Sequence, residues 1–384
     1  MLIKSLIKQY EDAKGTFLVP NYYKNFNCKT VHCRDSCCVD WLVTITMDQY
    51  FLLHGLDVEK ELKNKIDRTF RPFEKPTPLR YAEIVHKLDG DCPLHKSDGF
   101  CLLHERCDEA ALPMVCRTYP RAIKTNYIYE VSCANSCEKT LELLFENNDP
   151  IQFEDMILRF KVYKQETTIS SVEKVNYRKV RDIIFSNLAN RNFSFKDRIV
   201  HVGKLLQKLD LDETANIENL EFKTEDYQLD FDENYGYFME LTDWFIENNK
   251  RLAPYLNRIK DLHRGKNFYE IYISNKNHFE NLFDNHEIFF EKLLINDLFY
   301  RQFPFQNYTN SFYDEFIAIV GTYSFLRFIS INLMENKNSL DEYIDILSSF
   351  FTVISHSSFD KNIMILFKKM GLVTKDKLGQ ILQF

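Results

Sequence analysis

The chain has 384 residues, of which 45% are apolar and 15% aromatic, so a packed core is expected and wholesale disorder is excluded. The formal net charge of −7 provides no overall basic field, which argues against a nucleic-acid partner. Only 10 glycines and 10 prolines are present, as is typical of a fold with long helices and few tight turns.

The N-terminal segment does not have the pattern of a signal peptide. Its apolar run, MLIKSLIKQYEDAKG, is interrupted by Lys4 and Lys8 and is not followed by a cleavage site of small residues. Elsewhere, no uninterrupted apolar stretch approaches the ~18 residues that are typical of a membrane-spanning helix. We therefore expect a soluble, cytoplasmic protein without a membrane partner, in a compartment where thiols stay reduced.

The first 150 residues are predicted to form one irregular domain. The predicted elements, in chain order, are a strand that leads into a helix, a proline-rich loop, a small hairpin, a second strand and a helix, at residues 40–50, 71–80, 86–105, 126–133 and 138–148. Few of these segments are long enough to form extensive regular structure.

Residues 151–384 are predicted to form an all-α domain. Apolar residues recur at three- and four-residue intervals in six segments, at residues 179–189, 197–210, 235–248, 287–303, 312–334 and 339–356. Ser339 is expected to cap the last of these helices. The predicted fold class is therefore mainly α: an irregular, cysteine-rich, metal-binding N-terminal module with a few short strands, packed on an all-α C-terminal body.

All ten cysteines lie between Cys28 and Cys137. In a reducing compartment, this clustering points to metal binding or catalysis rather than to a disulfide framework. Two of the cysteines, Cys37 and Cys38, are adjacent, and no Cys-x2-Cys knuckle of a zinc ribbon is present. We rank an iron–sulfur cluster first, zinc second and a set of buried, inert thiols third.

Three segments carry a resemblance to a known family: FNCKTVHCRDSCCVDWLVTIT, GDCPLHKSDGFCLLHERCDEAALPMVCRTYPR and SCEKTLELL. The most specific marks are Cys37, Cys38 and Trp41 in the first segment and Cys116, Arg117, Pro120 and Arg121 in the second. Together these segments resemble the flagellin lysine-N-methylases, which belong to a wider group with a cysteine-rich zinc- or iron-chelating domain. In the second region, FEKLLINDLFYRQFPF (290–305) also looks similar to that family.

The resemblance implies an enzyme that N-methylates lysines of flagellin, with S-adenosylmethionine as the methyl donor, and that carries a 4Fe–4S cluster. The implied ligand pool is Cys28, Cys33, Cys37, Cys38, Cys92, Cys101, Cys116 and Cys137. Cys107 and Cys133 fall outside the family pattern. Since one cluster needs only four thiolates, either four of the eight are structural or a second metal is bound.

Methyl transfer to lysine needs a donor site and a neutral amine, and the unperturbed pKa of that amine is about 10.4. The chain has no Gly-x-Gly-x-x-Gly loop, so no donor site of the dinucleotide type is indicated. Arg117 and Arg121 could bind the donor carboxylate and Tyr119 could orient the amine, although we favour pairing of the arginines with the cluster or with nearby acids. Further polar candidates are His95, His104, Asn296 and Asp297.

Two rival interpretations stay open. The protein could be a non-enzymatic iron–sulfur protein that senses redox state or carries a cluster, with its helical half docking a partner. It could also be an adaptor stabilised by zinc.

Overall fold

The computed structural model describes residues 10–39, 42–107, 109–126, 128–163, 171–212, 215–218, 220–222, 224, 230–304, 311–355, 359–372, 380 and 382. The chain divides into two compact units. The cysteine-rich unit comprises Met1–Thr140 and Phe153–Thr168, and the helical unit comprises Leu141–Gln152 and Ile169–Phe384. The predicted boundary at residue 150 differs from this division, because Leu141–Gln152 belong to the helical unit and Phe153–Thr168 to the cysteine-rich unit.

Short elements make up most of the cysteine-rich unit. Its strands are β1 (Tyr10–Pro20), β2 (Thr44–Ile45), β3 (Phe70–Pro72), β4 (Ala82–Ile84), β5 (Arg121–Lys124), β6 (Glu130–Cys133) and β7 (Phe153–Tyr163). Its helices are η2 (Asn21–Asn25), η3 (Thr30–His32), α2 (Met47–His54), α3 (Lys60–Thr69), α4 (Leu102–Cys107), η4 (Glu109–Ala111), α5 (Met114–Thr118) and the start of α6 (Glu138–Phe145).

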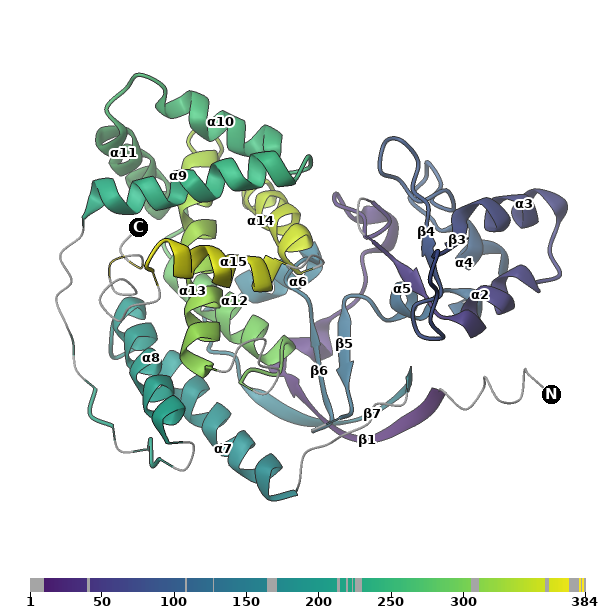
Figure 1. Cartoon of the computed structure of the whole chain (residues 1–384), viewed down its shortest axis with the longest axis horizontal. Coiled ribbons are helices and arrows are strands. Elements are labelled where there is room, and N and C mark those ends of the chain that lie inside the picture. Colours follow the sequence, from purple (N-terminus) through teal and green to yellow (C-terminus); the bar gives the residue numbers. More distant parts are fainter. Residues whose placement is uncertain are drawn as a thin grey trace. The chain divides into compact units, whose positions relative to one another are not determined.

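Two long strands, β1 and β7, belong to a four-stranded sheet that the sequence did not predict. The sheet has the order β5-β6-β1-β7, in which β1 and β7 have eleven residues each and pair antiparallel along their whole length (Figure 1). The expectation of an all-α region from residue 151 is therefore wrong for residues 153–163. The periodicity of this segment could not reveal a partner strand that lies near the other end of the unit, and long-range pairing decides strand formation.

The second sheet, with the order β2-β4-β3, belongs to a core that contains or contacts five of the ten cysteines. The predicted strand and helix at 40–50 are confirmed as β2 and α2, and the Gln49 side chain accepts a hydrogen bond from the Thr46 backbone N–H at the start of α2 (3.3 Å). The predicted hairpin at 86–105 is also confirmed, because His95 and Cys101 pair across it.

The helical unit confirms the predicted periodic segments. Its helices after α6 are α7 (Ser171–Leu188), α8 (Phe195–Leu211), α9 (Phe231–Asn248), α10 (Ala253–His263), α11 (Phe268–Leu282), α12 (His286–Tyr300), α13 (Phe312–Leu333), α14 (Leu340–Ser355) and α15 (Phe359–Lys369). Helices dominate the described part of the chain, so the mainly α class holds.

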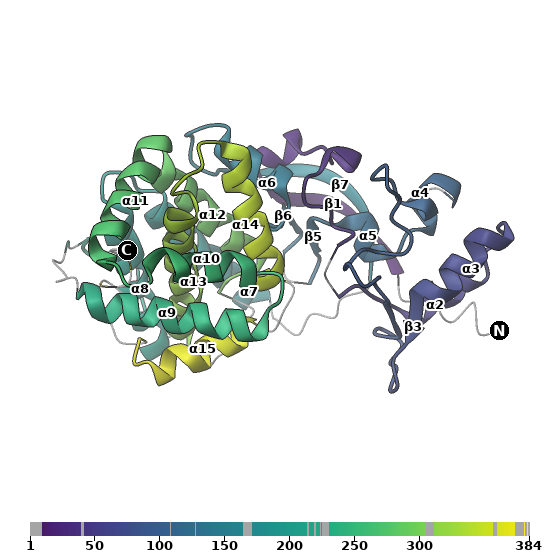
Figure 2. The same cartoon turned by 90° about the horizontal axis from the view of Figure 1, so that it is seen from above.

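Helix α13 is the core of the helical unit, and Figure 2 shows it among its neighbours. It contacts α8, α10, α11, α12, α14 and α15. Among the described residues, α13 has the length and apolar composition of a membrane span, with a mean hydropathy of 1.6. However, 94% of this apolar window is buried inside the protein, as expected for the central helix of a packed bundle.

Side-chain caps fix where α13 begins. Asp210, at the end of α8, accepts hydrogen bonds from the backbone N–H groups of Phe312 (2.7 Å) and Tyr313 (3.0 Å), and Ser311 accepts one from Asp314 (3.1 Å). A carboxylate at a helix N-terminus satisfies N–H groups that lack partners within the helix and interacts favourably with the helix dipole. The predicted cap of α14 is also confirmed, because the Ser339 hydroxyl oxygen accepts a hydrogen bond from the backbone N–H of Glu342 (3.2 Å).

A buried ion cluster joins α12 to the turn between α7 and α8. Glu291 is fully buried and accepts hydrogen bonds from Arg191 Nη2 (2.8 Å) and Arg198 Nη1 (2.6 Å). The neighbouring Lys292 donates to the carbonyl of Asn147 (2.8 Å), and burial lowers the pKa of Lys292 to about 8. These contacts attach the segment after α6 to the helical unit.

Two helical glycines allow a matched test of core packing. A Cβ at Gly321 in α13 would meet the buried ring of Phe367 on α15, whereas a Cβ at the exposed Gly236 in α9 would meet nothing within 4 Å. We expect Gly321→Ala to destabilise the protein by about 1–3 kcal/mol because the core is overpacked. Gly236→Ala should stabilise it by about 0.5–1 kcal/mol through helix propensity. Thermal unfolding of both variants measures the two signs, and equal shifts would contradict the packing of α15 on α13.

Candidate active site in the cysteine-rich unit

Four of the expected ligands come from three chain segments and meet at one apolar core. Cys92 is buried in this core, and the half-buried Cys38, Cys101 and Cys116 pack against it. The backbone N–H of Cys92 donates to the carbonyl of Cys38 (2.9 Å), which holds the first two segments together. We call Cys38, Cys92, Cys101 and Cys116 the central thiol group.

The electrostatics of the central thiol group agree with this convergence. Burial, together with the negative charges of Cys38 and Cys101, raises the pKa of Cys92 to about 12. Burial also raises the pKa of Cys116, again with contributions from the charges of the other three. The pKa of Cys38 shifts the other way, because the Cys37 thiol forms a hydrogen bond to its sulfur. Four thiolates in these positions repel one another, and a bound cation would relieve that repulsion.

A second set of thiols consists of two cysteines that precede Cys38 in the chain, Cys28 and Cys33, and of Cys137. Burial, together with the charges of Glu138, Cys137 and Cys28, raises the pKa of Cys33 to about 12. Glu138 is itself buried and forms an ion pair with Lys29 (2.6 Å). We call Cys28, Cys33 and Cys137 the outer thiol group. The sequence placed both groups in one pool, and the fold separates them.

The other three cysteines, Cys37, Cys107 and Cys133, are not assigned to either group. The pKa of Cys37 is raised mainly by its hydrogen bond to Cys38. The charges of Cys116, in the central thiol group, and of Cys28, in the outer thiol group, raise it as well. Cys107 packs against the core of the central thiol group, and Cys133 is fully buried in β6. None of the ten cysteines forms a disulfide.

The central thiol group has the number and type of ligands that one cubane cluster or one tetrahedral zinc ion takes. Yet across the described residues no three His, Cys, Asp or Glu side chains are placed so that they could hold a single metal ion.

The structure separates the three candidate catalytic residues. The Arg121 guanidinium lies over the ring of Phe26 (4.9 Å), and the Tyr119 hydroxyl is hydrogen-bonded to Ser136 Oγ (3.0 Å). Arg117 instead donates to Met114 Sδ (3.3 Å) at the edge of a cavity. Of the three, Arg117 is the residue that lines a space for a ligand.

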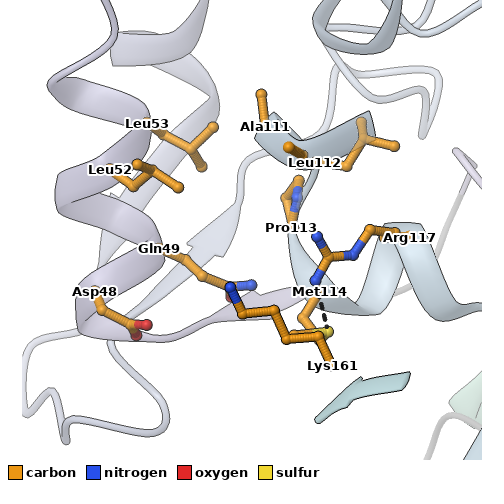
Figure 3. Close-up of a pocket in the computed structure, with 11 residues that line it drawn as sticks. Asp48, Gln49, Leu52, Leu53, Ala111, Leu112, Pro113, Met114, Arg117 and Lys161 are labelled. Atoms are coloured by element: carbon orange, nitrogen blue, oxygen red, sulfur yellow. Dashed lines mark hydrogen bonds between the residues drawn. The ribbon is translucent and has the colours of Figure 1, made fainter. Parts of the chain in front are cut away.

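This cavity has a volume of about 100 Å³ and lies wholly within the cysteine-rich unit. One wall is α2, another is the segment from η4 to α5, and Lys161 of β7 closes a third side (Figure 3). Figure 3 shows the side chains of Arg117, Lys161 and Asp48 reaching toward the space between these walls. The cavity thus combines two cations and one carboxylate with apolar side chains.

None of the remaining polar candidates lines this cavity. His95 Nδ1 is hydrogen-bonded to Asp91 (2.5 Å), and His104 is exposed on α4. Asn296 and Asp297 are 1% and 6% exposed, so neither side chain lies on a solvated face of α12. Trp41, a mark of the family resemblance, lies outside the described residues.

A family model for the FliB lysine N-methylase C-terminal domain matches residues 181–380, which is more than half of the 384 residues. The chain belongs to the FliB lysine N-methylase family. No curated protein and no solved structure matches it. The family match falls in the helical unit, whereas the cysteine motifs lie at residues 28–137, so two separate parts of the chain agree on flagellin lysine N-methylase.

Sequence reasoning missed Asp48, Met114 and Lys161, which line this cavity. Asp48 lies in the first turn of α2, and its sequence context indicates only a helix start. Lys161 reaches the cavity from β7, a strand that the sequence did not predict. No local signal could have placed it beside Arg117.

Proposed function

We propose that the protein transfers methyl groups from S-adenosylmethionine to lysine side chains of flagellin in the cytoplasm. The observation that carries this proposal is the match to the FliB lysine N-methylase C-terminal domain over residues 181–380. The flagellin-methylase resemblance of the cysteine-rich segments supports it independently.

The reaction is an in-line displacement. The neutral lysine amine attacks the methyl carbon, the carbon–sulfur bond breaks, and its electron pair stays on sulfur, which leaves as the thioether S-adenosylhomocysteine. The amine loses one proton to a base or to water. Because the free amine has a pKa of about 10.4, the site must favour its neutral form, and burial against apolar side chains has that effect.

The 4Fe–4S cluster implied by the family would be held by the central thiol group, and zinc is the alternative. When bound, it would neutralise the mutually repelling thiolates and tie together the segments that carry Cys38, Cys92 and Cys116. Metal binding of this kind contributes directly to folding stability, because the unfolded chain has no preformed site. The outer thiol group would be structural or would hold a second metal.

Incubation of the anaerobically purified protein with unmodified flagellin and labelled S-adenosylmethionine tests the proposal. We expect label on lysine and mass increments of one methyl group in the flagellin peptides. A matched reaction with flagellin whose lysines have been acetylated should incorporate none. Unmodified flagellin after incubation with metal-loaded protein would favour the rival interpretation, a non-enzymatic iron–sulfur sensor or adaptor.

A further inference from the structure

The guanidinium of Arg117 lines the cavity without a strong hydrogen-bond acceptor among the described residues. A guanidinium has five N–H donors and is matched best by a planar carboxylate. Within the described residues, the side-chain hydrogen bond of Arg117 is to Met114 Sδ, a weak acceptor, and no described carboxylate forms an ion pair with it. The strongest hydrogen-bonding capacity of Arg117 is therefore available to a ligand in the cavity.

The other charged residues extend this pattern. Lys161 adds a second cation to the lining, and Asp48 adds one carboxylate from the first turn of α2. The Asp48 carboxylate accepts a hydrogen bond from the Thr46 hydroxyl, and no described basic side chain forms an ion pair with it. A cavity with a guanidinium on one side and a carboxylate on another is complementary to an amino-acid group, which carries both charges.

The rest of the lining is apolar. Leu53 is 1% exposed and forms the floor with Pro113, while Leu52 and Ala111 continue the apolar surface. The cavity encloses about 100 Å³, below the range of about 300–1,000 Å³ that is usual for sites that bury a whole small ligand. It can therefore enclose the amino-acid end of a ligand, while the rest of the ligand lies on the exposed side chain of Leu52. Such a surface is suited to the flat face of a nucleoside base.

We propose that this cavity binds the S-adenosyl methyl donor, with its α-carboxylate on Arg117, its α-ammonium group toward Asp48, and its nucleoside along Leu52, Leu53 and Pro113. This inference rests on the proposed function, because it assigns the donor site of that same reaction.

The position of Arg117 also connects the cavity to the central thiol group. Arg117 follows Cys116 on the five-residue helix α5, and Cys116 packs against the thiol-bearing core while Arg117 and Met114 line the cavity. Fixing Cys116 in a metal centre would fix the helix that carries Arg117. The metal would then organise the donor site through the chain, with no direct contact to the donor required.

The test compares two ligands on the full-length protein by isothermal titration calorimetry. S-adenosylhomocysteine carries the amino-acid group, and 5′-methylthioadenosine shares the nucleoside and thioether but lacks that group. Loss of a charge-assisted, bidentate contact should weaken binding of S-adenosylhomocysteine to Arg117→Met by about 10- to 100-fold. Binding of 5′-methylthioadenosine should change by less than about threefold.

Two further variants control for charge and for folding. Arg117→Lys keeps the charge without the fork, so its loss should fall between those of the parent and Arg117→Met. Arg106→Met removes an exposed arginine of α4 outside the cavity and should bind both ligands as the parent does. The thermal unfolding midpoint of each variant shows whether the fold is retained.

Equal loss of both ligands in a folded Arg117→Met, or no loss of either, would overturn the assignment of the carboxylate to Arg117. Methylation of flagellin by the parent separates this failure from the failure of the proposed function. If the parent transfers methyl groups while Arg117→Met binds S-adenosylhomocysteine normally, the donor site lies elsewhere and the enzyme assignment stands.

Discussion

Cys101→Ser is expected to remove most of the bound metal from the protein, whereas Cys107→Ser retains it. Both cysteines pack against the same apolar core. The charge of Cys101 acts on Cys92 and Cys116, whereas the charge of Cys107 acts on Cys101, and Cys107 lies outside the ligand pool that the family resemblance implies. A hydroxyl is a poor ligand for iron or zinc compared with a soft thiolate. Iron, acid-labile sulfide and zinc contents of anaerobically purified variants give the readout.

Cys33→Ser decides the role of the outer thiol group. If that group holds a second metal, the variant should lose part of the total metal and keep the metal of the central thiol group. Metal content unchanged from the parent would make the outer group structural. Equal retention of metal by Cys101→Ser and Cys107→Ser would contradict the proposed ligand assignment.

Glu291→Gln is expected to cause the largest loss of stability among single substitutions in the helical unit. Glu291 is fully buried and Arg198 is 4% exposed, so the variant leaves a buried guanidinium without its counter-charge. Removing one partner of a buried ion pair typically costs about 3–5 kcal/mol. For a unit of this size, that loss should lower the midpoint of thermal unfolding by roughly 6–20 °C.

Lys260→Ala provides the matched control. Its partner Asp243 lies 2.6 Å away, but both side chains are largely exposed, and surface pairs contribute little because water screens them. The control should unfold within experimental error of the parent. A shift of similar size in both variants would mean that the Glu291 cluster does not hold α12 against the turn between α7 and α8.

Local pattern predicted much of the fold. Apolar residues at three- and four-residue intervals identified α7, α8, α9, α12, α13 and α14, because one face of each helix packs inside the unit. The same pattern did not identify α10, α11 and α15 or the paired strands β1 and β7. In β1 and β7 the stabilising partner lies far away along the chain, so neither strand carries enough local information to be recognised.

The candidate site shows the same division. Composition and spacing indicated a metal-binding thiol pool, because thiols crowded into one region have few other uses in a reducing compartment. They could not separate Cys38 from Cys33, or Arg117 from Arg121. The first separation depends on which core each sulfur packs against. The second depends on whether a side chain faces Phe26 or the cavity.

By itself the sequence determined the family, the helical character of the second half and the kind of ligand that its cysteines offer. All three follow from residue type and short-range spacing. Only the tertiary structure decided which four thiols converge, that β7 supplies Lys161 to the cavity, and that Arg117 faces a space for a ligand. Each of these depends on contacts between segments that are distant along the chain, and spacing within one segment carries no information about such contacts.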